Sequence, residues 1–291
     1  MYKLYRKNNY NVMHFRFDSI TEFITFLNSN PVCSEVFSDP SSISGSYDFT
    51  QTHSLEEAID LCRFGYHKDF NKLIELKMKL EKYVKMSSKK NKQYNDYIGY
   101  VPDVKAYLEG NPLSMLNKSN PQRKKIDIYM NTSFYGNTSS SAIFNRGAIV
   151  LTLVEILENL GYSVDFHLFE MSTVSEQMHF SEFILKQETE RLNPQKLYFP
   201  LCHPSWIRRL NFRLIEETKD ATNYGWAFGY GRPSDIMTIR EIIEPKPNDI
   251  IIPTIDELNI YGNDIIDDAN NLFDYVNQSS DKEFVLQRIK K

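Results

Sequence analysis

The sequence has few cysteines and no long apolar run. Its three cysteines, Cys33, Cys62 and Cys202, lie far apart and are odd in number. This pattern argues against a disulfide framework and predicts a reducing compartment. No stretch approaches the roughly eighteen consecutive apolar residues of a transmembrane helix, and the N-terminus lacks the apolar segment of a secretory signal. We therefore expect a cytoplasmic protein that has no membrane-spanning segment.

Motifs that mark several enzyme classes are also missing. The chain has no Gly-Lys-Ser/Thr phosphate loop, no three-glycine dinucleotide fingerprint and no second Cys/His pair at zinc spacing. Asp267 and Asp268 are neighbours on a predicted helix, so they do not face one another as a general acid and base. No internal repeat has a fixed period. Because these motifs are absent, the sequence does not indicate which reaction, if any, the protein catalyses.

The composition is that of a globular protein, but the charge is unevenly spread. Hydrophobic residues make up 41% and charged residues 25% of the chain, enough to bury a core. The formal net charge of −4 combines a local excess of +8 over 72–125 with one of −7 over 214–291. The basic segment predicts either a solvated helix and loop or a surface for RNA or DNA. The opposed charges also allow a homo-oligomer.

The sequence predicts two regions, of which the first, 1–121, is mostly helical. Residues 13–17 alternate between apolar and polar side chains, as in a strand. Ser19 and Ser54 each precede a glutamate by three residues, a capping box that starts a helix. Further helices are expected at 68–86 and 102–110.

The second region, 122–291, contains the clearest pattern. A short apolar strand at 126–130, a polar loop, a buried helix at 142–160 and a strand at 162–169 form a βαβ unit, which implies a parallel sheet. Weaker patterns predict further strands at 180–185 and 249–253. They also predict helices at 204–217 and 263–278.

The polar loop after the first of these strands carries a family resemblance. A strand that ends in Asp-x-Ser-x-Ser, followed by a long helix and another strand, is typical of von Willebrand factor A-like domains, which this region resembles. The resemblance implies a Rossmann-like, mainly parallel sheet flanked by helices, and a divalent metal held at that motif. Here the matching positions are Asn131, Ser133 and Tyr135.

This loop departs from the motif in two of its three positions. Asn131 is neutral where the family has an aspartate, and a site without that carboxylate holds Mg²⁺ weakly. A degenerate Mg²⁺ site at Asn131 and Ser133 is therefore one interpretation. The other is a hydrogen-bonded loop without a cofactor, in which Ser139 or Ser140 caps the next helix.

The segment that starts at Cys202 offers a second candidate site. Cys202 and His203 are adjacent, so on one helix or strand their side chains point in different directions. The sequence does not indicate a distant residue that would complete a catalytic site with either of them. If the segment binds an anion, we expect Arg208, Arg209 and Arg146 to bind it, because guanidinium groups pair bidentately with phosphate. The alternative is structural, with His203 at a helix entry and an arginine joining two segments.

A third candidate is the stretch 223–231, in which glycines alternate with aromatic residues. Tyr224 and Trp226 could stack on bases or sugars. A packed surface loop, whose glycines allow positive φ, explains the same composition.

The whole chain, in addition, resembles an uncharacterised family of proteins encoded by tailed bacteriophages, a domain of unknown function. The matching pieces are THSLEEAIDLCRFGY (52–66), GYVPDVKAYLEGNP (99–112), the NTS loop, NRGAIVLTLVEILENLGYSVD (145–165), LCHPSWIRRLNF (201–212) and, more loosely, DIIIPTIDEL (249–258). This resemblance implies a phage origin, and with it the host cytoplasm, but no reaction.

Together these observations favour a non-catalytic binding protein whose partner is another protein. Two alternatives stay open. One is an RNA- or DNA-binding protein that uses the basic segment 72–125. The other is a metal-dependent enzyme that uses the loop of Asn131 and Ser133.

Overall fold

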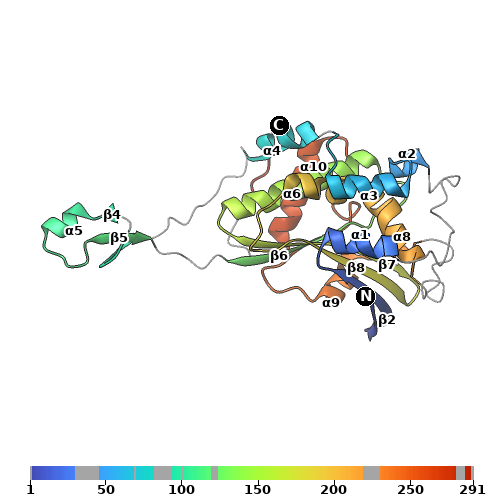
Figure 1. The fold of residues 1–291 in the computed structure, drawn as a ribbon, viewed down its shortest axis with the longest axis horizontal. Coiled ribbons are helices and arrows are strands. Elements are labelled where there is room, and N and C mark those ends of the chain that lie inside the picture. The colour runs from blue at the N-terminus through green and yellow to red at the C-terminus, as the bar shows by residue number, and fades with distance from the viewer. Residues whose placement is uncertain are drawn as a thin grey trace.

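The protein, here a computed structural model, is built around one mixed β-sheet with helices on both faces (Figure 1). The structure describes residues 2–29, 46–68, 70–81, 93–99, 101–118, 124–218, 230–279 and 286–289. A second, small sheet lies apart from the main sheet (Figure 1).

The main sheet combines strands from both predicted regions. Its path is β1–β2–β8–β7–β6–β10, and β9 also pairs with β7. The strands are β1 (Tyr2–Lys7), β2 (Tyr10–Phe17), β6 (Lys125–Asn131), β7 (Ser163–Val174), β8 (Gln177–Lys186), β9 (Arg232–Pro233) and β10 (Ile250–Ile252).

The sheet is mixed rather than mainly parallel as predicted. β6 is parallel to both β7 and β10, and β2 is parallel to β8. The pairs β1–β2, β7–β8 and β7–β9 are antiparallel. The third predicted strand, 180–185, follows β7 after a tight turn at Ser175, which has φ 54°. Because so short a connection joins only antiparallel neighbours, β8 forms a hairpin with β7.

The predicted βαβ unit is confirmed as β6, α6 (Ser140–Asn159) and β7. The backbone N–H of Ala142 donates to Oγ of Ser139 at 3.2 Å, so Ser139 caps the helix as one interpretation predicted. α6 is buried on nearly every side. Gly161 follows the helix with φ 87°, a conformation that a glycine adopts without steric cost.

Most helices cover one face of the main sheet (Figure 1). There the apolar side chains of α6 pack with those of neighbouring helices and with one set of alternating strand residues. Besides α6, these helices are α1 (Ile20–Ser29), α3 (Leu55–Phe64), α4 (Phe70–Glu81), α7 (Pro194–Cys202), the π-helix η2 (Trp206–Asn211), α8 (Phe212–Glu216) and α10 (Ile265–Gln278). A further short helix is α2 (Tyr47–Thr50).

The opposite face of the sheet has a smaller cover. α9 (Ile236–Ile243) places Ile239 and Ile242 against Phe169 and Met171 of β7 and the neighbouring strands. Sequence reasoning did not predict this helix. Its eight residues follow the aspartate cap Asp235, whose carboxylate accepts hydrogen bonds from the next turn.

The small sheet has the order β3–β5–β4 and forms, with one short helix, what we call the lobe, residues 93–118. Its elements are β3 (Gln93–Asp96), β4 (Val101–Pro102), α5 (Val104–Leu108) and β5 (Met115–Lys118). Pro102 lies in β4 rather than in a first helical turn as predicted, and Asp103 caps α5. Among the described residues of the lobe, Ala106 alone has a buried apolar side chain.

The first region is less helical than predicted, because residues 2–118 also contribute β1–β5. The predicted boundary after residue 121 also runs across the main sheet, since β2 pairs with β8. The capping boxes at Ser19 and Ser54 are confirmed: each hydroxyl accepts the N–H of the glutamate three residues later, both at 3.1 Å.

Candidate functional site

The loop after β6, where sequence reasoning expected Mg²⁺ ligands, is closed by internal hydrogen bonds. Oδ1 of Asn131 accepts the N–H of Ser133 at 2.9 Å. Oγ of Ser133 donates to the carbonyl of Met171 at 3.1 Å and accepts its N–H at 3.0 Å. Both side chains are buried. These bonds attach the loop to β7 and use the oxygens that a metal ion would need.

A buried guanidinium group lies beside this loop. Arg146 of α6 donates from Nη1 to the carbonyl of Asn131 at 2.7 Å and reaches that of Pro253, after β10, at 3.5 Å. Burial lowers the pKa of Arg146 to about 9, and the charge of Asp256 offsets part of that effect. A cation therefore already occupies the space between the carboxyl ends of β6 and β10, which opposes the binding of a second cation there.

Arg208 and Arg209 join η2 to distant loops. Arg208 donates to the carbonyls of Phe49, Gly136 and Thr138 at 2.7, 3.1 and 2.9 Å. Arg209 donates to Oγ1 and the carbonyl of Thr52 at 2.6 and 2.7 Å. These contacts direct the guanidinium groups to protein oxygens, which favours the structural interpretation over anion binding.

His203 and Cys202 are both buried at the end of α7. Nδ1 of His203 accepts the N–H of Ser205 at 3.2 Å, and its ring stacks on Phe199. Burial, with the charge of Lys68, lowers the pKa of His203 to about 4. Burial also raises the pKa of the Cys202 thiol. A neutral imidazole beside a protonated thiol is not an activated nucleophilic pair.

Tyr224 and Trp226 lie outside the residues that the structure describes, as do residues 82–92 and 119–123 of the basic segment. Their predicted roles stay predictions.

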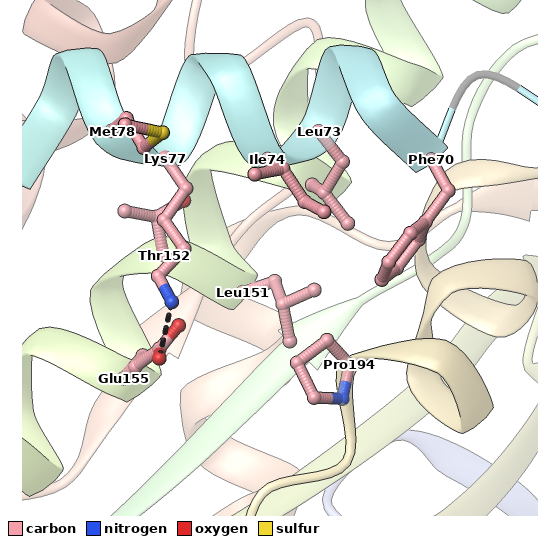
Figure 2. Close-up of a pocket in the computed structure, with 9 residues that line it drawn as sticks. All are labelled: Phe70, Leu73, Ile74, Lys77, Met78, Leu151, Thr152, Glu155 and Pro194. Atoms are coloured by element: carbon pink, nitrogen blue, oxygen red, sulfur yellow. Dashed lines mark hydrogen bonds and ion pairs between the residues drawn. The ribbon is translucent and has the colours of Figure 1, made fainter.

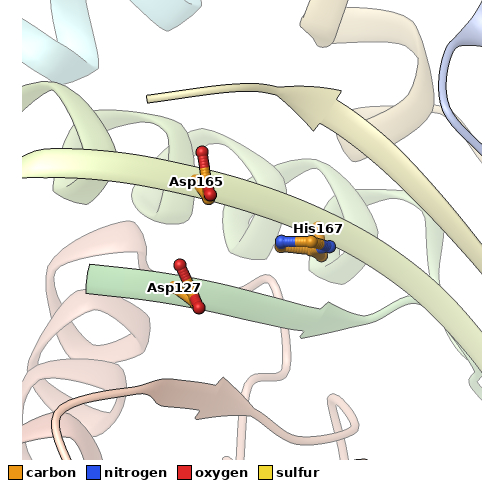
Figure 3. A group of neighbouring side chains, drawn as sticks. All are labelled: Asp127, Asp165 and His167. Atoms are coloured by element: carbon orange, nitrogen blue, oxygen red, sulfur yellow. The ribbon is translucent and has the colours of Figure 1, made fainter. Parts of the chain in front are cut away.

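A cluster that sequence reasoning missed lies on the α9 face of the sheet (Figure 3). Asp127 of β6 is paired in register with Asp165 of β7, and His167 follows two residues later on the same face. One potential ligand atom from each lies within 4.8 Å of the other two. The signal in the sequence was that Asp127, Asp165 and His167 each alternate with apolar residues that face the helical core.

Glu182 of β8 supports the histidine of this cluster. Its Oε1 lies 3.0 Å from Nδ1 of His167, and its Oε2 lies 3.5 Å from Nε2 of His14. Burial alone would raise the pKa of Glu182, but the adjacent His14 and His167 side chains, with the charge of Arg16, outweigh burial and lower the pKa to about 2. Glu182 is therefore an anion that orients the His167 ring.

A small cavity of about 270 Å³ lies between α4 and α6 (Figure 2). Its walls are mainly apolar, and an ion pair of 2.5 Å between Lys77 and Glu155 lies at one end. The cavity falls just below the usual size of ligand sites and has no set of convergent polar groups. It does not indicate a catalytic site.

The lobe exposes large apolar side chains. Six of the fourteen exposed large hydrophobic residues in the described chain lie within 97–108. They are Tyr97, Ile98, Val101, Val104, Tyr107 and Leu108. Ile98 and Leu108 are 81% and 78% exposed. So dense an apolar surface is typical of an interaction site.

A comparison with protein families matches residues 5–277 to a domain of unknown function, DUF7192. The chain belongs to the DUF7192 family. The match begins within β1 and ends within α10, so nearly all of the main sheet and its helices, and the whole lobe, lie within the family's domain. No curated protein and no solved structure matches the chain.

Among the described residues, α6 is the one helix long and apolar enough to cross a membrane. Of its 18-residue apolar window, 78% is buried within the protein. That burial agrees with its place in the core of the βαβ unit.

Proposed function

We propose that this DUF7192 chain is a phage-encoded, non-catalytic binding protein that engages a protein partner through the apolar surface of the lobe. The observation that carries the proposal is the exposure of six large apolar side chains on a lobe with almost no core of its own. A sheet whose strands are four, two and four residues long buries little surface by itself. A partner that covers the lobe would bury the apolar side chains that the lobe by itself leaves exposed.

The charge of the lobe favours a protein over a nucleic acid. Residues 93–118 contain two lysines and three acidic residues, so the lobe itself offers no cationic surface to phosphates. Basic residues flank it in the sequence, at 89–92 and 123–125. The best-fitting partner is a protein with an apolar groove and an acidic rim.

The proposed fold of the second region is a von Willebrand A-like core that acts as a scaffold. The strand, long helix and strand that the resemblance implies support it. The hydrogen bonds of Asn131 and Ser133, with the guanidinium of Arg146 beside them, support a binding role over metal-dependent catalysis at that loop. The phage origin rests on the sequence resemblance.

Site-specific photo-crosslinking in the source cells tests this proposal. A photoreactive benzoylphenylalanine replaces Leu108 in the full chain, and the matched control replaces Met237 of α9, which is 67% exposed. We expect a discrete protein adduct from position 108 that position 237 does not give. An RNA adduct at 108 would support the nucleic-acid alternative instead. An adduct with a second copy would indicate a homo-oligomer, and equal labelling at both positions would refute a lobe-specific partner.

A further inference from the structure

The cluster of Asp127, Asp165 and His167 has the chemistry of a metal centre. Two carboxylates and one imidazole are ligands typical of Zn²⁺ and other divalent transition metals. The three side chains come from two adjacent parallel strands and lie on one face of the sheet (Figure 3). Their ligand atoms lie within 4.8 Å of one another, so a shift below about 1 Å would place them around one ion with bonds of 2.0–2.2 Å.

A buried carboxylate oxygen without a hydrogen bond points to a missing partner. Asp127 is 6% exposed, and its Oδ1 atom has no hydrogen-bond partner. Nζ of Lys125 lies 3.8 Å from that oxygen, beyond hydrogen-bond length. Burying an anionic oxygen without a hydrogen bond destabilises the folded protein. A metal ion between the three side chains would remove that cost.

The histidine is oriented as metal-bound histidines are. Nδ1 of His167 lies 3.0 Å from Oε1 of Glu182, within reach of a hydrogen bond to that carboxylate. A ring held in this way offers its other nitrogen, Nε2, to a metal ion. A carboxylate behind a ligating histidine fixes the ring and strengthens the ligand.

Two lysines form ion pairs with the two carboxylates. Nζ of Lys125 lies 2.6 Å from Oδ2 of Asp165, and Nζ of Lys246 lies 3.1 Å from Oδ2 of Asp127. These lysine side chains are 47% and 72% exposed. Exposed ammonium groups can move into water at a small cost, so they would compete with a metal ion without blocking it.

From this arrangement we propose that Asp127, Asp165 and His167 bind one divalent transition-metal ion, with Glu182 orienting His167. The site lies on the opposite face of the sheet from α6 and does not depend on the function of the lobe. Three protein ligands leave a coordination position for water or for a group supplied by a partner.

Titration of the metal-free full chain with Zn²⁺ alone tests the site by calorimetry, with the melting temperature as a second readout. We expect one ion per chain and a higher melting temperature. Asp127→Asn and His167→Gln should each weaken binding at least tenfold. Asp165→Asn, at a more exposed position, serves if either variant does not fold. Asp274→Asn, which removes a surface ion pair, is the control and should bind as the wild type does.

One variant separates this proposal from a structural ion-pair network. Lys125→Met removes the ammonium group that competes for Asp165, so Zn²⁺ should bind more tightly than in the wild type. A network without a metal predicts only a loss of stability in that variant. Absence of saturable binding, or equal binding in the wild type and in Asp127→Asn, would overturn the proposal.

Discussion

The contact between α6 and α7 predicts that Gly147→Ala destabilises the protein, against the usual trend for helices. Alanine in place of a mid-helix glycine normally stabilises a protein by about 1 kcal/mol. At position 147, however, the added Cβ would lie 2.3 Å from the carbonyl oxygen of Leu201 and 2.7 Å from Sγ of Cys202. The carbonyl oxygen of Leu201 cannot give way without moving α7, because it belongs to the backbone of that helix.

The size of the effect follows from these opposed contributions. Overpacking in a core costs about 1–3 kcal/mol, and a contact this short with backbone belongs at the upper end of that range. After the helix propensity gain, the free energy of unfolding should fall by roughly 2 kcal/mol. For a chain of this length the melting temperature should fall by about 3 °C.

Urea unfolding followed by circular dichroism measures this loss. Gly136→Ala is the matched control, since no heavy atom lies within 4 Å of the Cβ it would add, and its stability should match the wild type. If Gly147→Ala were as stable as the wild type, or more so, the close packing of α6 on α7 would be wrong.

Three further substitutions test other buried contacts. His203→Asn should remove a pH dependence. As pH falls from 6.5 to 4, mainly the unfolded state gains a proton at His203, whose pKa in the folded state is lowered to about 4, so the wild type should lose about 2.5 kcal/mol relative to the variant. Parallel unfolding curves at both pH values would contradict this. Asp268→Ala leaves the buried amide of Asn145 and two backbone N–H groups without an acceptor, and urea unfolding should show a loss of about 3 kcal/mol or more; an unchanged midpoint would count against those bonds. Arg208→Lys cannot reach three carbonyls at once, so hydrogen exchange should speed up at residues 46–53, and unchanged rates would show that Arg208 does not hold that segment.

The sequence predicted the local elements well where one physical signal dominated. The alternation around Phe15 predicted β2, the capping box at Ser54 predicted α3, and the apolar run after Ser139 predicted α6. Each of these signals depends on a few neighbouring residues. That locality is why they could be found without knowledge of the fold.

Long-range pairing was harder to predict. Nothing local indicates that β2 pairs with β8, more than 160 residues away, so the first region was expected to lie outside the sheet. The cluster of Asp127, Asp165 and His167 depends on the same kind of information, the register of β6 against β7. The exposure of Leu108 could not be predicted locally either, because it depends on which parts of the chain pack against α5.

A direct titration tests whether the lobe binds a protein partner. The protein captured at position 108 is purified, labelled and titrated by fluorescence anisotropy with the wild-type chain, with the double variant Tyr107→Ser/Leu108→Ser, and with Met237→Ser as control. Loss of two exposed apolar anchors should weaken the affinity roughly tenfold or more, while the control binds as the wild type does. Equal affinity for all three chains would contradict a binding site on the lobe.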